Sequence, residues 1–202
     1  MLNRFRGLMT GVMTPIADLL LRRGISPDAV TITGTLAVVT AALWLYPTGH
    51  LLAGTLVIMV FVLTDSLDGT MARRSGRSSS WGAFLDSTLD RFADSAIFAG
   101  LVLWFFGAGD DRLPGALALA CLVLGSIVPY ARARAEGLGM TAAVGIAERA
   151  DRLMAVLVAT LLVGFGLSPV VLTVTLALLA VASLATIVQR MATVRRQAAA
   201  AA

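Results

Sequence analysis

The sequence has few charged residues, no lysine, one cysteine and one histidine. Only 14% of its 202 residues are charged, against roughly 25% in an average soluble domain. This composition argues against a water-soluble fold, and we expect no nucleic acid partner. Cys121 has no second cysteine with which to form an intrachain disulfide. His50 follows Pro47, Thr48 and Gly49, a pattern typical of a surface turn.

Hydrophobic residues make up 58% of the chain, and they form runs about as long as a bilayer core requires. We therefore predict an all-α integral membrane protein, a single domain over 1–202. Residues 1–23 mix arginine with apolar residues, which predicts an interfacial amphipathic juxtamembrane helix. The bundle spans 28–191, and 192–202 form a C-terminal tail that we expect to be frayed. The six predicted transmembrane helices are 28–46, 51–73, 80–106, 113–136, 150–166 and 169–191.

The distribution of arginine predicts the orientation of these helices. All sixteen basic residues are arginine, and most flank alternate ends of the predicted spans, whereas the opposite loops carry almost none. By the positive-inside rule, both termini face the cytoplasm, as expected for a multi-pass protein of the cell membrane.

Aspartates recur at helical spacing on either side of the loop between the second and third spans. Asp65 and Asp68 are three residues apart, and Asp86 and Asp90 are four residues apart, so each pair shares one helix face. A short loop favours antiparallel neighbours. We therefore expect the second and third spans to pack together and bring the four carboxylates into one layer.

Four carboxylates in the membrane need a counter-charge. Intramembrane acids cost roughly 2.5 to 3.5 kcal/mol each on insertion scales, and Arg91 alone cannot neutralise four of them. Carboxylate oxygens suit hard divalent cations. We predict a site for Mg²⁺ or Mn²⁺, with two ions, held by Asp65, Asp68, Asp86 and Asp90. Gly69, Ala72 and Gly82 lie on or beside these faces, where small residues permit either close helix packing or a ligand against the backbone.

This segment resembles the signature of the CDP-alcohol phosphotransferase family, with every motif position present: Asp65-x2-Asp68-Gly69-x2-Ala72-Arg73-x8-Gly82-x3-Asp86-x3-Asp90. The resemblance implies a six-helix membrane enzyme, usually a homodimer, that binds a CDP-linked lipid and divalent metal at the cytoplasmic side. It implies that Asp65, Asp68 and Asp86 are the main metal ligands, and that Asp90 is the catalytic base and a further ligand. The positions that it assigns to CDP-lipid binding are Gly69, Ala72, Arg73 and Gly82, with Pro27, Asp28 and Thr31 in a second segment.

Arginines at three helix ends indicate the acceptor. Since the planar guanidinium group suits phosphate, we predict a pocket for the phosphate of a polyol, formed by Arg132, Arg149, Arg152 and Arg190. The pattern resembles the actinobacterial branch of the family, in which CDP-diacylglycerol (CDP-DAG) donates a phosphatidyl group to inositol phosphate and CMP is released. Any one of these arginines equally fits a positive-inside residue that contacts membrane lipids, but the convergence of three helix ends on the motif side favours the pocket.

Two other functions remain open at this stage. A family member that takes glycerol 3-phosphate would need a similar arginine pocket. A cation transporter would also carry intramembrane acids, but transporters tend to place them near the midplane between two related halves. Here the acids lie toward one side, and no repeat is evident.

Overall fold

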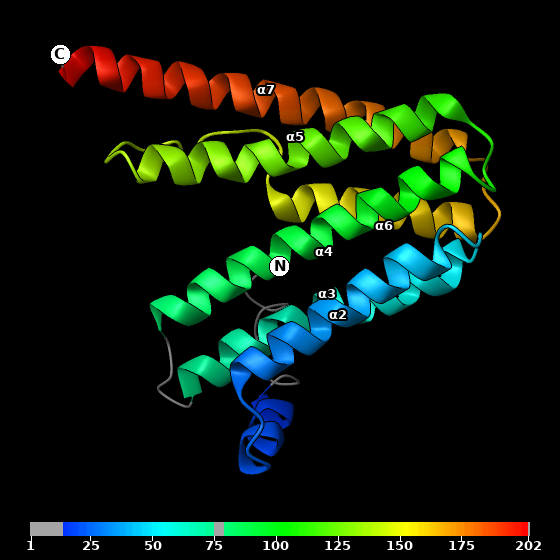
Figure 1. The fold of residues 1–202 in the computed structure, drawn as a ribbon, viewed down its shortest axis with the longest axis horizontal. Coiled ribbons are helices and arrows are strands. Elements are labelled where there is room, and N and C mark those ends of the chain that lie inside the picture. The colour runs from blue at the N-terminus through cyan, green and yellow to red at the C-terminus, as the bar shows by residue number, and fades with distance from the viewer. Residues whose placement is uncertain (1–13, 75–78, 202) are drawn as a thin grey trace, which may run out of the picture.

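The protein is a bundle of α-helices (Figure 1). The computed structural model describes residues 14–74 and 79–201, and for residues 63–66, 68 and 201 it describes the backbone alone. No strand occurs in these two ranges. The helices are α2 (Pro27–Leu45), α3 (Leu51–Arg74), α4 (Ser80–Phe106), α5 (Arg112–Glu136), α6 (Arg149–Gly164) and α7 (Val170–Ala201).

Each of these six helices starts within one residue of its predicted start, because side-chain caps fix several of the starts. The Ser26 Oγ accepts a hydrogen bond from the Ala29 amide at 3.2 Å, and Pro27 occupies the first turn of α2, where its missing N–H costs nothing. The Ser79 Oγ accepts from the Gly82 amide at 3.0 Å. This second cap sets where α4 begins and therefore where its aspartates lie.

The end of α7 differs from the prediction. We expected the last helix to end at residue 191, but α7 continues to Ala201, so the predicted frayed tail is helical. Alanine has the highest intrinsic helix propensity, and the final segment is rich in it. The Gln197 side chain also accepts from the Thr141 amide at 2.9 Å and donates to the Thr141 carbonyl at 2.6 Å. These bonds attach the extended end of α7 to the loop between α5 and α6.

Residues 14–22 form a helix that docks on the end of α3. The first part of the predicted 1–23 helix, residues 1–13, lies outside the described residues. Ala17 is fully buried against Leu67 and Met71 of α3. The Arg74 guanidinium contacts both carboxylate oxygens of Asp18, at 2.7 and 2.9 Å. An apolar contact and a bidentate ion pair thus join this segment to the end of the signature helix.

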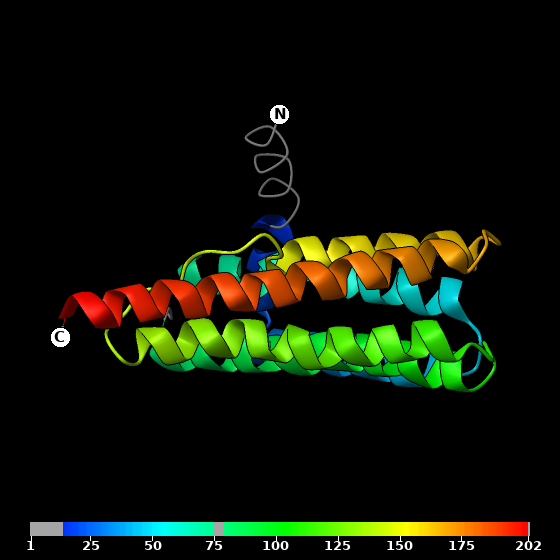
Figure 2. The same cartoon turned by 90° about the horizontal axis from the view of Figure 1, so that it is seen from above.

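The six helices form a ring in which each packs mainly against two others, in the order α2, α3, α6, α7, α5, α4 and back to α2. Figures 1 and 2 show α5 beside α7 along much of their length. The prediction that α3 and α4 pack together was wrong for the described residues. Helix α2 packs against both of them and separates them over most of their length. A short loop makes the two helices that it joins antiparallel, but it does not determine whether a third helix packs between them.

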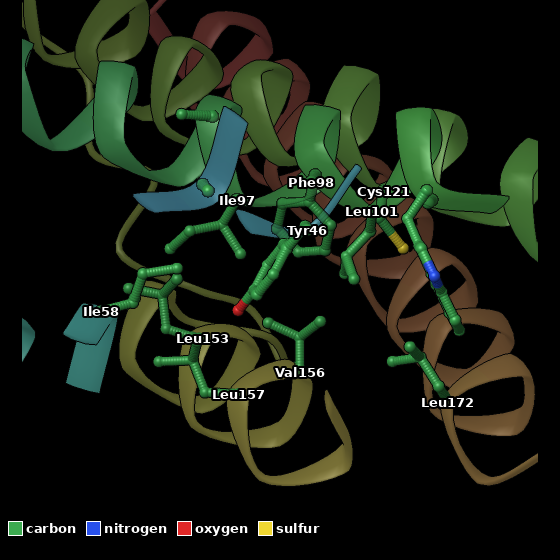
Figure 3. Close-up of a cluster of buried hydrophobic side chains, with 14 of the residues drawn as sticks. Tyr46, Ile58, Ile97, Phe98, Leu101, Cys121, Leu153, Val156, Leu157 and Leu172 are labelled. Atoms are coloured by element: carbon green, nitrogen blue, oxygen red, sulfur yellow. The ribbon is translucent and has the colours of Figure 1, made fainter. Parts of the chain in front are cut away.

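A hydrophobic core fills the inside of the ring (Figure 3). Tyr46, at the end of α2, lies among Ile97 and Leu101 of α4 and Val156 of α6. The Tyr46 hydroxyl and the Thr55 hydroxyl are hydrogen-bonded at 2.9 Å, which satisfies both polar groups away from water. The outer surface is also apolar: Leu36, Trp44, Leu178 and Val181, for example, are at least 60% exposed. An apolar exterior around an apolar core is what a bilayer requires.

Within the part of the chain that the structure describes, three helices are long and apolar enough to cross a membrane, namely 27–45, 112–136 and 170–200. Helix α6 has only 16 residues, and the first half of α4 carries Asp86, Asp90, Arg91 and Asp94. Helix α6 therefore falls short of the length that a span usually requires, and α4 carries more charge than a span usually does. Six spans and an interfacial helix stay a prediction.

Helices α2 and α4 approach each other closely at Gly100. A Cβ atom at Gly100 would collide with the carbonyl group of Ala42, and backbone cannot yield as a side-chain tip does. We expect Gly100→Ala to destabilise the protein by about 2 kcal/mol through this overlap, seen as a lower midpoint of thermal unfolding in detergent. Gly34→Ala is the control, because its Cβ would have 3.9 Å to Phe61. Equal midpoints in the two variants would contradict the close-packing account.

Candidate active site

Helix α4 carries a row of three aspartates at intervals of one turn. Asp86 and Asp90 are half-buried, whereas Asp94 is only 8% exposed. Four-residue spacing puts all three on one face of the helix. The row therefore runs from the helix start, capped by Ser79, toward the bundle interior.

Arg149, the first residue of α6, bridges the two inner aspartates. Its Nη2 lies 2.6 Å from Asp90 Oδ1, and its Nε lies 3.2 Å from Asp94 Oδ1 and 3.3 Å from Asp94 Oδ2. Arg91 adds longer contacts from its Nη2, 3.6 Å to Asp90 and 3.8 Å to Asp94. Ion pairs with this little exposure are screened much less than surface pairs, so Arg149 couples α6 firmly to α4.

Asp90 and Arg149 line a pocket that is formed by four helices. The other lining residues come from α2, including Thr31 and Gly34, from α3, Phe61 and Val62, and from α4, Ala93. The predicted base, one predicted nucleotide contact and one predicted phosphate-binding arginine thus meet in one place. Helices α3 and α4 face this shared pocket although α2 lies between them elsewhere.

The metal site can be compared with the structure only in part. Asp65 and Asp68 belong to α3, but their side chains lie outside the described residues. Among the described residues no group of three or more acids, histidines or cysteines forms a metal site. Asp86 makes no hydrogen bond or ion pair with another described residue, and Phe61, which lines the pocket, precedes Asp65 by one helical turn. A half-buried carboxylate without a cationic partner fits a divalent cation. The four-aspartate site stays a prediction.

The predicted CDP-lipid residues lie at the start of α2, the end of α3 and the start of α4. Pro27 and Asp28 open α2, and the Trp81 indole N–H donates to Asp28 Oδ2 at 3.1 Å, linking α2 to the start of α4. The Gly82 amide donates the hydrogen bond to Ser79 Oγ that caps α4. The remaining predicted contacts are Thr31, which lines the pocket, and Gly69, Ala72 and Arg73 in the last turns of α3.

The four predicted phosphate-binding arginines fall into two pairs. Arg149 and Arg152 have Asp94 and Arg91 as charged neighbours, whereas Arg132 and Arg190 have Glu136 and Glu148. Only Arg149 lines the pocket that contains Asp90.

The other three arginines have protein partners. Arg132 is exposed and pairs with Glu136 at 2.9 Å. Arg152 is 3% exposed and donates to the carbonyls of Gly125 and Ala147 at 3.4 and 3.5 Å. Arg190 is 5% exposed and donates to the carbonyls of Val128 and Val144. Arg190 therefore fastens the loop before α6 to α5 and α7.

The predicted site residues include neither Trp81 nor Asp94, although the sequence led us to expect that Asp94 orients Asp90 or the acceptor. Asp94 continues the four-residue spacing of Asp86 and Asp90, so the periodic pattern contained the signal. Trp81 had none, because a tryptophan at a helix start gives no indication of a partner 53 residues earlier.

A model of the CDP-alcohol phosphatidyltransferase family matches residues 24–147, and this chain belongs to that family. It is therefore a membrane-bound transferase, and not the cation transporter that was the alternative from a different class. The phosphatidylinositol phosphate synthase of Streptomyces avermitilis is 50% identical, over 98% of this chain and 84% of the relative. The phosphatidylinositol phosphate synthase of Cutibacterium acnes is 49% identical, over 97% and 98%.

Solved structures of a relative have the same fold. The phosphatidylinositol phosphate synthase of Mycobacterium tuberculosis with CDP-DAG bound gives a TM-score of 0.87 at 46% identity, over 91% of this chain and 93% of the other. The same enzyme in complex with manganese and citrate gives 0.85 at 46% identity, over 90% and 88%. The family resemblance read from the aspartate signature is confirmed.

Proposed function

We propose that this protein transfers the phosphatidyl group of CDP-DAG to a hydroxyl of inositol phosphate, with release of CMP. The observation that carries the proposal is the ion pair between Asp90 and Arg149. It joins the proposed base to a cation suited to the acceptor phosphate, in a pocket next to the aspartate signature. Relatives that are 45–50% identical and act as phosphatidylinositol phosphate synthases support the choice of acceptor.

One set of residues is proposed to bind the donor, CDP-DAG, and another to bind the acceptor. Asp28, Thr31 and the small residues Gly69, Ala72 and Gly82 are the proposed surface for the cytidine diphosphate, together with Pro27 and Arg73. The acceptor hydroxyl attacks the phosphorus that bears diacylglycerol, the bond to the CMP oxygen breaks, and the hydroxyl proton passes to Asp90. Arg149 holds the acceptor phosphate beside Asp90, so that the hydroxyl is aligned before it reacts.

A divalent cation completes the proposed donor site. Asp65, Asp68, Asp86 and Asp90 are the proposed ligands, and two Mg²⁺ or Mn²⁺ ions fit four carboxylates. A bound cation of this kind neutralises diphosphate oxygens and the departing CMP. The manganese complex of the Mycobacterium tuberculosis relative supports the use of a divalent metal.

Removal of divalent metal is expected to lower CMP release to the rate without enzyme. Without the cation, the four acids cannot stabilise the negative charge on the departing CMP. The measurement is CMP release by detergent-purified protein after treatment with EDTA, followed by separate titrations with Mg²⁺, Mn²⁺ and Ca²⁺. Recovery with Mg²⁺ or Mn²⁺ is the expected result. Full activity in EDTA would contradict the metal assignment.

The acceptor is tested by the same assay with inositol phosphate, glycerol 3-phosphate, free inositol and serine. Inositol phosphate is expected to give the highest kcat/KM. A higher value with glycerol 3-phosphate would keep the chemistry and overturn the acceptor, whereas equal rates with free inositol would remove the role of the phosphate. No metal-dependent CMP release with any of the four would contradict the proposed enzyme activity.

We also propose six membrane spans with both termini and the site at the cytoplasmic face, and a homodimer. The arginine distribution supports the orientation, and the family resemblance supports the dimer. Labelling of single cysteines at Ala199 and Gly49 with an impermeant reagent in intact cells tests the orientation, since only Gly49→Cys should react. Light scattering of the purified protein tests the dimer, and a monomeric mass would contradict it.

A further inference from the structure

Asp94 lies one turn beyond Asp90 on α4 and outside the family signature. It is 8% exposed, and both of its carboxylate oxygens contact the Nε of Arg149, at 3.2 and 3.3 Å. A carboxylate buried to this extent is costly unless it is paired. Asp94 is paired with an arginine that reaches it from another helix, and the same arginine contacts Asp90.

The charges around Asp94 are mainly positive. Arg149, Arg91 and Arg152 are its charged neighbours, so these three arginines, with Asp90 and Asp94, contribute three positive and two negative charges. Asp94 accepts from Nε, the inner nitrogen of the Arg149 guanidinium, while Nη2 points to Asp90 at 2.6 Å. This arrangement turns the outer end of the guanidinium toward Asp90 and the pocket that both residues line.

The contact with Asp94 orders the Arg149 side chain at the start of α6. Glu148, the N-cap residue, makes no side-chain capping hydrogen bond, and an arginine side chain has many rotamers to lose when it is ordered. A buried carboxylate that binds Nε from one side reduces this freedom. The outer nitrogens are then preorganised for a planar, two-oxygen contact.

We propose that Asp94 is a positioning residue for the acceptor: by binding the Nε of Arg149, it directs the outer guanidinium nitrogens at a phosphate monoester beside Asp90. This inference rests on the proposed function, because it assigns the selection of phosphorylated acceptors to that site. Asp94 itself contacts neither the substrate nor the reacting atoms. Its effect reaches the acceptor through Arg149.

The first test is Asp94→Asn, which keeps the shape of the side chain and removes its charge. The KM for inositol phosphate is expected to rise on the order of tenfold, while the KM for CDP-DAG and kcat stay within about twofold of wild type. Asp151→Asn is the matched control, because Asp151 is exposed on the first turn of α6. A lower kcat with an unchanged KM for inositol phosphate would overturn the proposal.

The second test asks whether Asp94 acts through Arg149. In the Arg149→Gln background, Asp94→Asn is expected to have little further effect on the KM for inositol phosphate, since the group that it positions is absent. Additive effects of the two substitutions would contradict the proposal. If Asp94→Asn does not fold, the KM for inositol phosphate is measured for Asp94→Glu instead. A rise in this KM is again expected, because the longer side chain displaces the carboxylate from Arg149.

Different results would contradict the proposed function and the role of Asp94. If the wild-type protein releases no CMP with inositol phosphate, the proposed function fails. If the wild-type protein is active and Asp94→Asn leaves the KM for inositol phosphate unchanged, only the role of Asp94 fails.

Discussion

Replacement of Asp90 by asparagine is expected to lower kcat for CMP release by about a thousandfold. Asparagine has nearly the same shape, so the ring of helices and the pocket are preserved, but its amide cannot take the proton from the acceptor hydroxyl. It also removes the negative partner of Arg149 in the 2.6 Å ion pair. The measurement is steady-state kinetics of CMP release in detergent, with saturating CDP-DAG, inositol phosphate and Mg²⁺.

Asp151→Asn is the control for this substitution, because it makes the same chemical change at an exposed position outside the pocket. The control should retain wild-type kcat, and both variants should unfold at similar temperatures. If Asp90→Asn keeps more than about a tenth of the wild-type kcat, Asp90 is not the general base, and the base must be sought elsewhere.

Replacement of Arg149 by glutamine is expected to raise the KM for inositol phosphate by about a hundredfold. Glutamine can still donate a hydrogen bond, but it has neither the charge nor the forked geometry that a phosphate requires. Of the ion pairs described above, Asp90 and Asp94 then keep the longer contacts from Arg91, at 3.6 and 3.8 Å. The KM for CDP-DAG should change much less, because Arg149 is assigned to the acceptor.

Arg134→Gln is the matched control for Arg149→Gln. Arg134 is exposed in the last turn of α5, so its loss removes one cytoplasmic positive charge without touching the pocket. A hundredfold rise in both variants would mean that general electrostatic attraction, rather than Arg149, recruits the acceptor. An unchanged KM in Arg149→Gln would remove the acceptor role of this residue altogether.

Local sequence features predicted the helices well. Ser26 with Pro27, and Ser79 before α4, are capping signals that depend on a few adjacent residues, and the structure has the expected hydrogen bonds. The end of α7 was missed because an alanine-rich tail is ambiguous in isolation. Its contact with the α5–α6 loop through Gln197 joins residues 56 positions apart.

The arrangement of the helices was harder to predict than their positions in the chain. Spacing placed Asp86 and Asp90 on one face, but nothing local indicated that α2 would pack against both α3 and α4. The arginines illustrate the same limit. The sequence identified them as a cationic group, but it could not distinguish their roles. In the fold Arg149 lines the pocket, whereas Arg190 donates its hydrogen bonds to the carbonyls of Val128 and Val144.

The most direct test of the central claim follows the acceptor phosphate into the lipid. Purified protein is incubated with CDP-DAG, Mg²⁺ and inositol phosphate labelled with ³²P, and the label in the lipid fraction is compared with the CMP released. The proposed reaction predicts labelled phosphatidylinositol phosphate and CMP in equal amounts, and neither product with Asp90→Asn. Release of CMP without label in the lipid would mean that water or another alcohol is the acceptor, and would contradict the account.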